Sequence, residues 1–187
     1  MSVSRVGKGH VILSHGLNSS PDATKVTALA RVAEQLGWSS ERPDFAAIDR
    51  DARCGRFGDI DTRLELLRER ARAAATPLVL VGSSLGAFVS ALVSLEIDCI
   101  GLYLMAPPPF LDGYPRALTA ASVPTTIVHG WDDELIPAAT VINWAAPRRD
   151  RVLLVNDSHR LAAHVDFCAR QFREFLQSLQ ADTAAAA

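Results

Sequence analysis

The segment Gly82-Ser83-Ser84-Leu85-Gly86 has the pattern G-x-S-x-G, which can present a serine hydroxyl for nucleophilic attack. It follows an apolar run at 78–81 and precedes small and apolar residues at 87–95. A strand, this pattern and a helix in succession form a sharp turn that strains the serine backbone. Neighbouring chain then passes so close that the flanking glycine positions must lack a Cβ. The spacing predicts Ser84 as a nucleophile, and the alternative is an ordinary glycine-bounded turn.

A serine hydroxyl is a weak nucleophile near neutral pH, so it needs a general base and a carboxylate that orients this base. After such a turn the two partners follow in the order carboxylate, then histidine. Two later segments supply them: 129–137 follows the apolar run 125–128, and 156–161 follows the apolar run 151–155. Each lies just past a predicted strand, at the edge where open parallel sheets bind ligands. His159 in the second segment is therefore the predicted base.

Four segments in this order resemble those of the α/β-hydrolases, and most of all their small esterase-like members without a lid. They span residues 10 to 161 and are Val11-Ile12-Leu13-Ser14-His15-Gly16-Leu17-Asn18-Ser19-Ser20-Pro21, the turn at Ser84, the H-G-x-x-D-x-x-[IV]-P segment that ends at Pro137, and the loop with His159. The resemblance implies that Ser84 attacks a carbonyl carbon. His159 would carry its proton to the leaving group, and Asp133 would orient and stabilise the imidazolium.

The identity of the carboxylate is the main ambiguity. In the family pattern the acid stands four residues after the histidine of H-G and four before the proline, and Asp133 satisfies both counts. Asp132 is kept as the alternative, and Glu134 is disfavoured. Asp157 is expected to shape the turn before His159 through its side chain.

The resemblance also implies an oxyanion hole made of two backbone N–H groups. One belongs to Leu85, the residue after the nucleophile, and the other to Leu17 in the loop after the first strand. Gly16 would allow close approach of this loop, and Asn18 and Ser19 would support it by hydrogen bonds. The alternative for these polar side chains is a turn that caps the next helix.

Two connections are candidates for the walls of the site. Phe110, Leu111 and Tyr114 lie in a proline-rich connection at 106–116, too short for a lid domain, and could line an open acyl site. The alternative is a rigid loop whose aromatic side chains pack inward. The connection 44–59 contributes further candidates, whose charges would favour an anionic or polar leaving group: Arg53, Arg56 and Phe57.

The remaining polar residues indicate no further chemistry. His10, His129 and His164 are interpreted as structural, and no Cys/His cluster has the spacing of a zinc site. Cys54, Cys99 and Cys168 are scattered singly, as expected of reduced thiols. We therefore expect no metal and no organic cofactor. Four arginines are predicted to lie on the solvated face of a helix: Arg63, Arg68, Arg70 and Arg72.

Composition and charge indicate one soluble domain. The chain has 187 residues, 49% of them hydrophobic, and a formal net charge of −2, which disfavours nucleic acid as a partner. No apolar stretch approaches the ~20 residues needed to span a bilayer, and the first residues lack a secretion signal. A cytoplasmic location is the resulting expectation. Residues 1–8 and 181–187 are expected to be flexible ends of the single domain 1–187.

Strand-like and helix-like segments alternate along the chain, which predicts an α/β fold with a mostly parallel sheet covered on both faces. With the topology that the resemblance implies, the order of the six strands is 2-1-3-4-5-6, without a cap domain. The predicted strands are 10–14, 38–43, 78–82, 100–105, 124–129 and 151–155. The predicted helices are 22–36, 58–75, 84–95, 137–145 and 162–179.

These expectations combine into a serine hydrolase that cleaves a small carboxylic ester or thioester through an acyl-enzyme. A second hypothesis is a binding module that keeps the fold without catalysis. A third is an enzyme of other chemistry that needs no cofactor and uses the same three residues.

Overall fold

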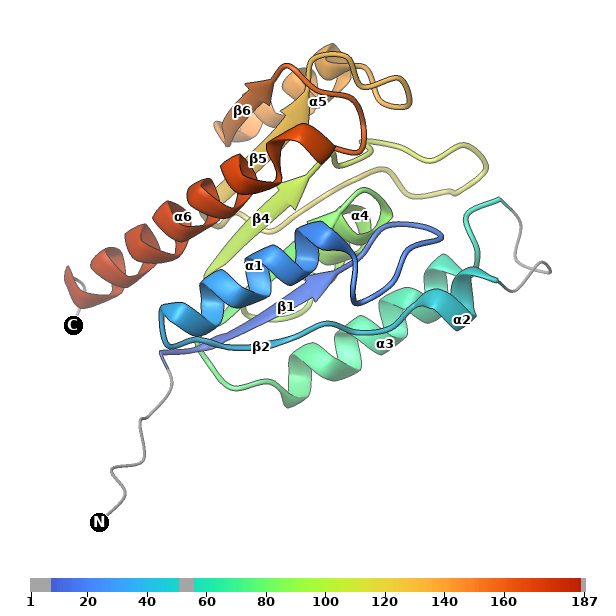
Figure 1. Cartoon of the computed structure of the whole chain (residues 1–187). Coiled ribbons are helices and arrows are strands. Elements are labelled where there is room, and N and C mark those ends of the chain that lie inside the picture. The colour runs from blue at the N-terminus through green and yellow to red at the C-terminus, as the bar shows by residue number, and fades with distance from the viewer. Residues whose placement is uncertain (1–7, 51–55, 186–187) are drawn as a thin grey trace.

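Six parallel strands form one sheet in the predicted order β2-β1-β3-β4-β5-β6 (Figure 1). The computed structural model describes residues 8–50 and 56–185, so Arg53, Cys54 and the outermost residues of both ends lie outside the described residues. The strands are β1 (His10–Ser14), β2 (Ser39–Glu41), β3 (Leu78–Ser83), β4 (Gly101–Met105), β5 (Thr125–Gly130) and β6 (Arg151–Val155).

Burial explains which strands the sequence predicts well. Every residue of β3, β4 and β5 is buried, because helices cover both faces of the sheet there, and such strands are nearly continuous apolar runs. The edge strand β2 is shorter than the predicted 38–43. Pro43 has no N–H to extend a ladder, and β2 ends before it at Glu41.

In the described part of the chain the five predicted helices are present, and one short α-helix is added. They are α1 (Thr24–Gln35), α3 (Ile60–Ala73), α4 (Leu85–Val93), α5 (Ala138–Ala145) and α6 (Val165–Ala185), with α2 (Ala46–Asp49) as the addition. A four-residue helix shows no hydrophobic periodicity, so the sequence did not predict α2. The helix α6 runs beyond the predicted end at 179 to Ala185, through alanines that favour helix.

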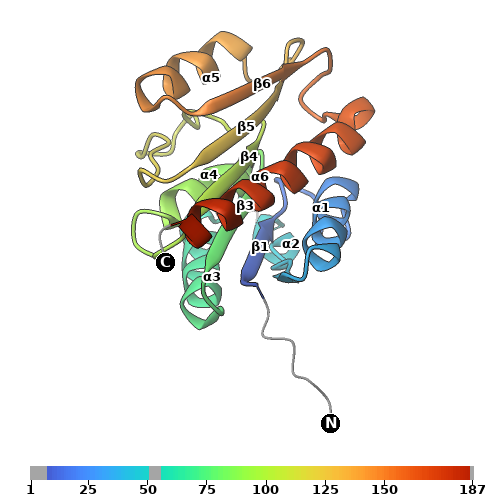
Figure 2. The same cartoon turned by 90° about the vertical axis from the view of Figure 1, so that its left-hand side faces the viewer.

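The helices form two layers. α1 and α6 lie side by side on one face of the sheet, and α3, α4 and α5 cover the other face (Figures 1 and 2). All nine residues of α4 are buried, as its small and apolar sequence predicts. Among the described residues, no helix combines the length and the apolar character needed to cross a bilayer.

The topology fixes where a site can form. The chain leaves β1 for β2 at one edge and returns to β3 on the other side of β1, so the strand order reverses between β1 and β3. Ligands of open parallel sheets bind at such a reversal, beyond the carboxyl ends of the strands. Residues 106–124, which join β4 to β5, contain no helix or strand, so no cap domain covers this edge.

Candidate active site

Ser84 stands at the tip of a sharp turn between β3 and α4. Its backbone has φ 54° and ψ −121°, a strained conformation for a residue with a Cβ. A Cβ on Gly82 would overlap the backbone of Gly86 and Ala87, and a Cβ on Gly86 would overlap the carbonyl of Ser14. Both glycines of the motif are therefore required for the close packing that the sequence predicts.

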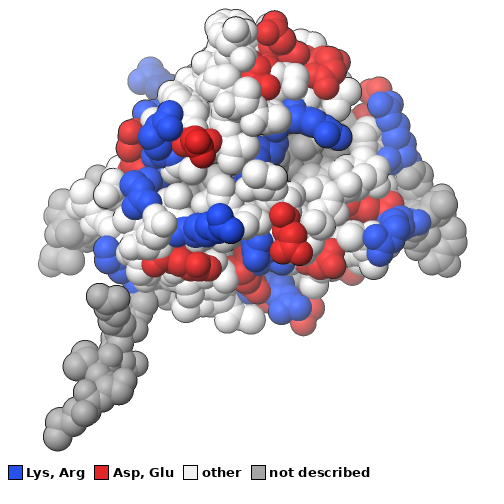
Figure 3. Space-filling view, viewed as in Figure 1, with Lys and Arg blue, Asp and Glu red and all other residues white. Residues whose placement is uncertain are grey.

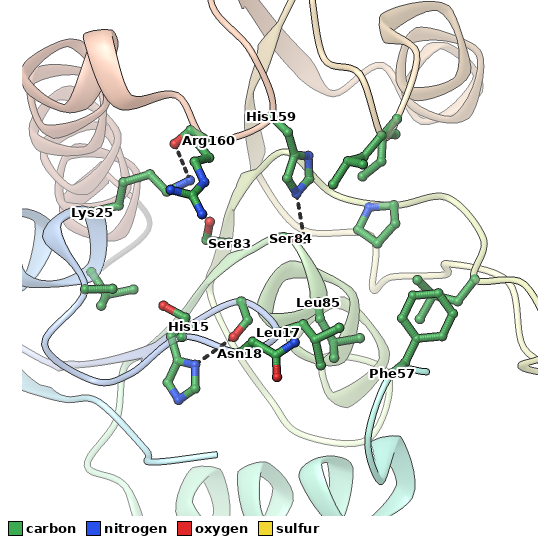
Figure 4. Close-up of a pocket in the computed structure, with 18 of the residues that line it drawn as sticks. His15, Leu17, Asn18, Lys25, Phe57, Ser83, Ser84, Leu85, His159 and Arg160 are labelled. Carbon is green, nitrogen blue, oxygen red and sulfur yellow. Dashed lines mark hydrogen bonds between the residues drawn. The ribbon is translucent and has the colours of Figure 1, made fainter. Parts of the chain in front are cut away.

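A chain of hydrogen bonds joins the hydroxyl of Ser84 through His159 to a buried carboxylate, and Figure 4 shows the first of them, between Ser84 and His159. Ser84 Oγ lies 2.9 Å from His159 Nε2, and His159 Nδ1 lies 2.8 Å from Asp133 Oδ2. The carboxylate only accepts, so the ring proton sits on Nδ1 and Nε2 is free to accept the proton of the serine. The arrangement can deprotonate Ser84 when it attacks.

The loop after β5 fixes the carboxylate of Asp133. Its Oδ1 accepts hydrogen bonds from the N–H groups of Leu135 and Ile136 at 3.0 and 2.8 Å. Burial raises the pKa of Asp133, but the hydrogen bond to His159 and these two N–H groups outweigh it, so the pKa is lowered. Asp132 is exposed, and Glu134 binds the backbone N–H of His159 at 3.1 Å rather than its ring.

A second histidine supports this acidic loop. His129 is buried at the end of β5, and its Nε2 donates to the carbonyl of Ile136 at 2.9 Å, closing the loop that holds Asp133. Burial lowers the pKa of His129, which keeps the ring neutral. Asp157 shapes the turn before His159, as expected: its carboxylate accepts from the N–H groups of Ser158 and Ala163.

Among the described residues, neither the N–H of Leu17 nor the N–H of Leu85 has a hydrogen-bond acceptor. Leu85 is the first residue of α4, and Leu17 belongs to the loop after β1; both line the same pocket as Ser84. Figure 4 shows them on the side of Ser84 opposite His159. Two unpaired N–H groups beside a nucleophile are the donors that an oxyanion hole requires.

A buried ion pair holds the loop that carries Leu17. Arg63 of α3 and Asp49 of α2 have side chains that are 0% and 1% exposed, and they bind each other. The guanidinium also donates to the carbonyls of His15 and Gly16 at 3.1 and 3.3 Å. The other carboxylate oxygen accepts from the N–H of Asn18 at 2.8 Å. The pair therefore binds the backbone on both sides of Leu17.

Arg63 corrects one expectation from the sequence. Its position on α3 was predicted to face solvent, but the side chain is fully buried against the ring of Phe45, 4.6 Å from the ring centre. His15 completes this layer: its Nε2 accepts from the N–H of Phe45 at 3.0 Å, so its Nδ1 donates to the carbonyl of Gly16 at 2.8 Å.

A pocket of about 900 Å³ opens above Ser84 and His159. Phe110 and Leu111 line it, and so do Arg56 and Phe57 from the connection before α3. Tyr114 does not: its ring packs edge-on against Phe88, and its hydroxyl donates to Asp61 at 2.7 Å. Among the residues that the structure describes, no group of three or more His, Cys, Asp or Glu could hold a metal ion.

Comparison with known structures shows to which family this chain belongs. A protein from Xanthomonas campestris pv. campestris, named as a hydrolase of the alpha/beta superfamily, is 55% identical, covers 91% of this chain and 99% of its own, and superimposes with a TM-score of 0.89. This chain belongs to the α/β-hydrolase superfamily. No protein-family model matches this α/β-hydrolase, and no curated protein matches it significantly.

More distant structures share its fold. An α/β serine hydrolase homologue from Coxiella burnetii is 24% identical, with a TM-score of 0.72, and the match covers 90% of this chain and 85% of the homologue. A serine hydrolase without a lid from Xanthomonas campestris is 20% identical, with a TM-score of 0.65 and coverage of 90% and 81%. A known structure with this fold thus also lacks a lid.

The structure brings to the site several residues that sequence reasoning missed. Asp49 and Arg63 support the loop after β1, and Lys25 and Arg160 line the pocket itself. Only Arg160 had a local signal, since it directly follows His159. The others reach the site of this α/β-hydrolase through packing between elements far apart in the sequence.

Proposed function

We propose that this α/β-hydrolase is a serine hydrolase that cleaves a small carboxylic ester or thioester through an acyl-enzyme. The observation that carries the proposal is the hydrogen-bonded chain Ser84, His159, Asp133, beside the N–H groups of Leu17 and Leu85, which have no acceptor among the described residues. In this proposal they serve as the nucleophile, its base, the orienting acid and the two donors for the developing negative charge.

In the first half of the reaction, Ser84 Oγ forms a bond to the carbonyl carbon and His159 Nε2 takes its proton. The carbonyl oxygen becomes an oxyanion that the N–H groups of Leu17 and Leu85 stabilise. When the bond to the leaving oxygen or sulfur breaks, Nε2 returns the proton to that atom. In the second half, His159 activates water, which attacks the acyl carbon and releases the acid and free Ser84.

The walls of the pocket favour an apolar acyl group of modest size. Phe110 is 62% exposed and Phe57 is half-buried, so both rings offer apolar surface to a ligand. Among the described residues no helical cap encloses the site, which leaves one side open to water. A short acyl chain would be covered by these rings, whereas a long chain would extend into solvent.

Replacing Phe110 by alanine is expected to reduce the preference for longer acyl chains. Butyrate has two more CH₂ groups than acetate, each worth about 0.8 kcal/mol when fully buried. Because the ring covers them only in part, the ratio of kcat/KM for 4-nitrophenyl butyrate over the acetate should fall about fivefold. Leu95→Ala, which removes an exposed leucine outside the pocket, should leave this ratio unchanged. An unchanged ratio in Phe110→Ala would exclude this ring from acyl binding.

Intact-mass measurement after treatment with a fluorophosphonate tests the proposed function. This reagent phosphonylates an activated serine with loss of fluoride, so the wild type should gain one adduct and Ser84→Ala none. Ser83→Ala is the matched control and should still be labelled. Absence of the adduct on the folded wild type would contradict an activated serine and favour a binding module on this fold.

A further inference from the structure

Two basic side chains lie together in the pocket, on the side of His159. Lys25 is in the first turn of α1, and Arg160 directly follows His159 in the loop after β6. Both line the pocket that contains Ser84. Lys25 Nζ donates to the carbonyl oxygen of Arg160 at 2.8 Å, so helix and loop hold each other in place (Figure 4).

Neither cation is neutralised by a carboxylate. Within the described residues, no ion pair involves Lys25 or Arg160, whereas five other arginines there each pair with an acidic side chain. On the face that Figure 3 shows, positive and negative side chains are likewise interspersed. Lys25 has three donors, and one of them is used by Arg160. The pocket therefore offers unpaired positive charge to a ligand.

Burial makes the charge of Lys25 costly without a ligand, whereas Arg160 lies at the exposed rim of the pocket. Desolvation and the neighbouring charge of Arg160 lower the pKa of Lys25. The charges of Cys168, Asp157 and Asp133 raise it without cancelling the effect of burial. A carboxylate, Asp112, also lines the pocket, but its side chain is exposed. An anion held between Lys25 and Arg160 would replace the water that the ammonium has lost.

The position of the two cations identifies the part of the substrate that they meet. His159 Nε2 must protonate the leaving atom, so the leaving group extends along the loop that carries His159 and Arg160. In Figure 4, Lys25 and Arg160 lie on one side of Ser84 and Phe57 lies on the other. Arg56, the third cation in the lining, stacks on Phe57 at 5.4 Å and so belongs to the opposite wall.

We infer that Lys25 and Arg160 form a subsite for an anionic group on the leaving group of the ester, a carboxylate or a phosphate. The subsite rests on the proposed function, because it names the substrate class of the same pocket. The preferred substrate is then an ester whose acyl group is short and apolar and whose alcohol or phenol carries an anionic substituent.

Matched acetate esters test the subsite. 4-Acetoxybenzoate and 4-acetoxyphenyl phosphate carry an anion on the leaving phenol, and 4-acetoxybenzamide has a similar shape without charge. Because the phenols differ in intrinsic reactivity, the informative quantity is the kcat/KM ratio of each anionic ester over the amide, compared between variant and wild type. Lys25→Gln and Arg160→Gln should each lower this ratio about 10-fold or more, since each removes a charge-assisted hydrogen bond.

Arg31→Gln is the matched control, because Arg31 is an exposed cation on the same helix that does not line the pocket. Its ratio should equal that of the wild type, and Lys25→Arg should retain most of the preference. If the kcat/KM ratio falls more for one anionic ester than for the other in Lys25→Gln, that ester shows whether the subsite prefers a carboxylate or a phosphate. Ratios that stay within twofold of the wild type in both Lys25→Gln and Arg160→Gln, or an equal loss in Arg31→Gln, would overturn the subsite.

A binding measurement separates failure of the subsite from failure of the proposed function. Titration of the Ser84→Ala protein with 4-hydroxybenzoate should show binding that weakens about 10-fold in the double variant Ser84→Ala/Lys25→Gln. Binding of this kind by a protein whose wild type hydrolyses none of the esters would retain the subsite and reject the hydrolase. Hydrolysis with an unaffected ratio would reject the subsite and retain the hydrolase.

Discussion

The variant Asp133→Asn is expected to lower kcat about 10⁴-fold while the protein remains folded. Asparagine would keep its oxygen toward the N–H groups of Leu135 and Ile136 and turn its NH₂ toward His159. His159 Nδ1 would then have to accept, which places the ring proton on Nε2 and leaves Ser84 without a base. The measurement is kcat on a small activated acetate ester, with thermal unfolding as the test of folding.

Asp132→Asn is the matched control for this prediction. Asp132 is adjacent in sequence and exposed, so kcat should stay within about twofold of the wild type, as is usual for surface substitutions. Full activity of Asp133→Asn combined with an inactive Asp132→Asn would assign the role to the other carboxylate.

Arg63→Met should destabilise the protein by about 3–5 kcal/mol, because it leaves the charge of Asp49 buried without a partner. For a domain of this size, the melting temperature should fall by about 6–20 °C. The carbonyls of His15 and Gly16 also lose their donor, so the loop with Leu17 is less firmly held and kcat should fall as well. Calorimetry and kinetics below the transition measure the two effects separately.

Arg68→Met on the same helix is the control. Arg68 pairs with Glu96 at the surface, and such pairs contribute about 0–1 kcal/mol. The double variant Arg63→Met/Asp49→Leu should regain stability, because an apolar pair can replace a buried ion pair. It should remain poor in kcat, because the N–H of Asn18 also lacks its acceptor. Full activity in the double variant would show that the ion pair does not position this loop.

The central strands were predictable because both of their faces are buried. Apolar runs then mark β3, β4 and β5 almost residue by residue, and the two segments predicted at 10–14 and 151–155 agree with the structure at both ends. The short helix α2 gave no such signal, although it carries Asp49. Buried strands can therefore be predicted from their apolar runs, whereas a short helix that positions a single side chain leaves no such pattern in the sequence.

The candidate site was predictable to the extent that its residues stand in local patterns. Ser84 needs glycines two positions away on either side, and Asp133 and His159 follow apolar runs that end at the same edge of the sheet. Arg63 had the opposite signal, since a cation on an amphipathic helix usually faces water. Its partner, Asp49, lies on another element, and no spacing along the chain indicates that the two meet inside the protein.

The edge position of β6 connects catalysis to local stability. Among the described strands β6 pairs with β5 alone, and four of its five residues are not fully buried. His159 follows it, so its ring reaches Ser84 and Asp133 only while β6 keeps its register. A slip of one residue would move the chain by about 3.3 Å, more than the hydrogen bonds can tolerate. Catalytic activity therefore depends on the pairing of the edge strand β6 with β5. It should be lost at denaturant concentrations at which the other strands of the sheet are still folded.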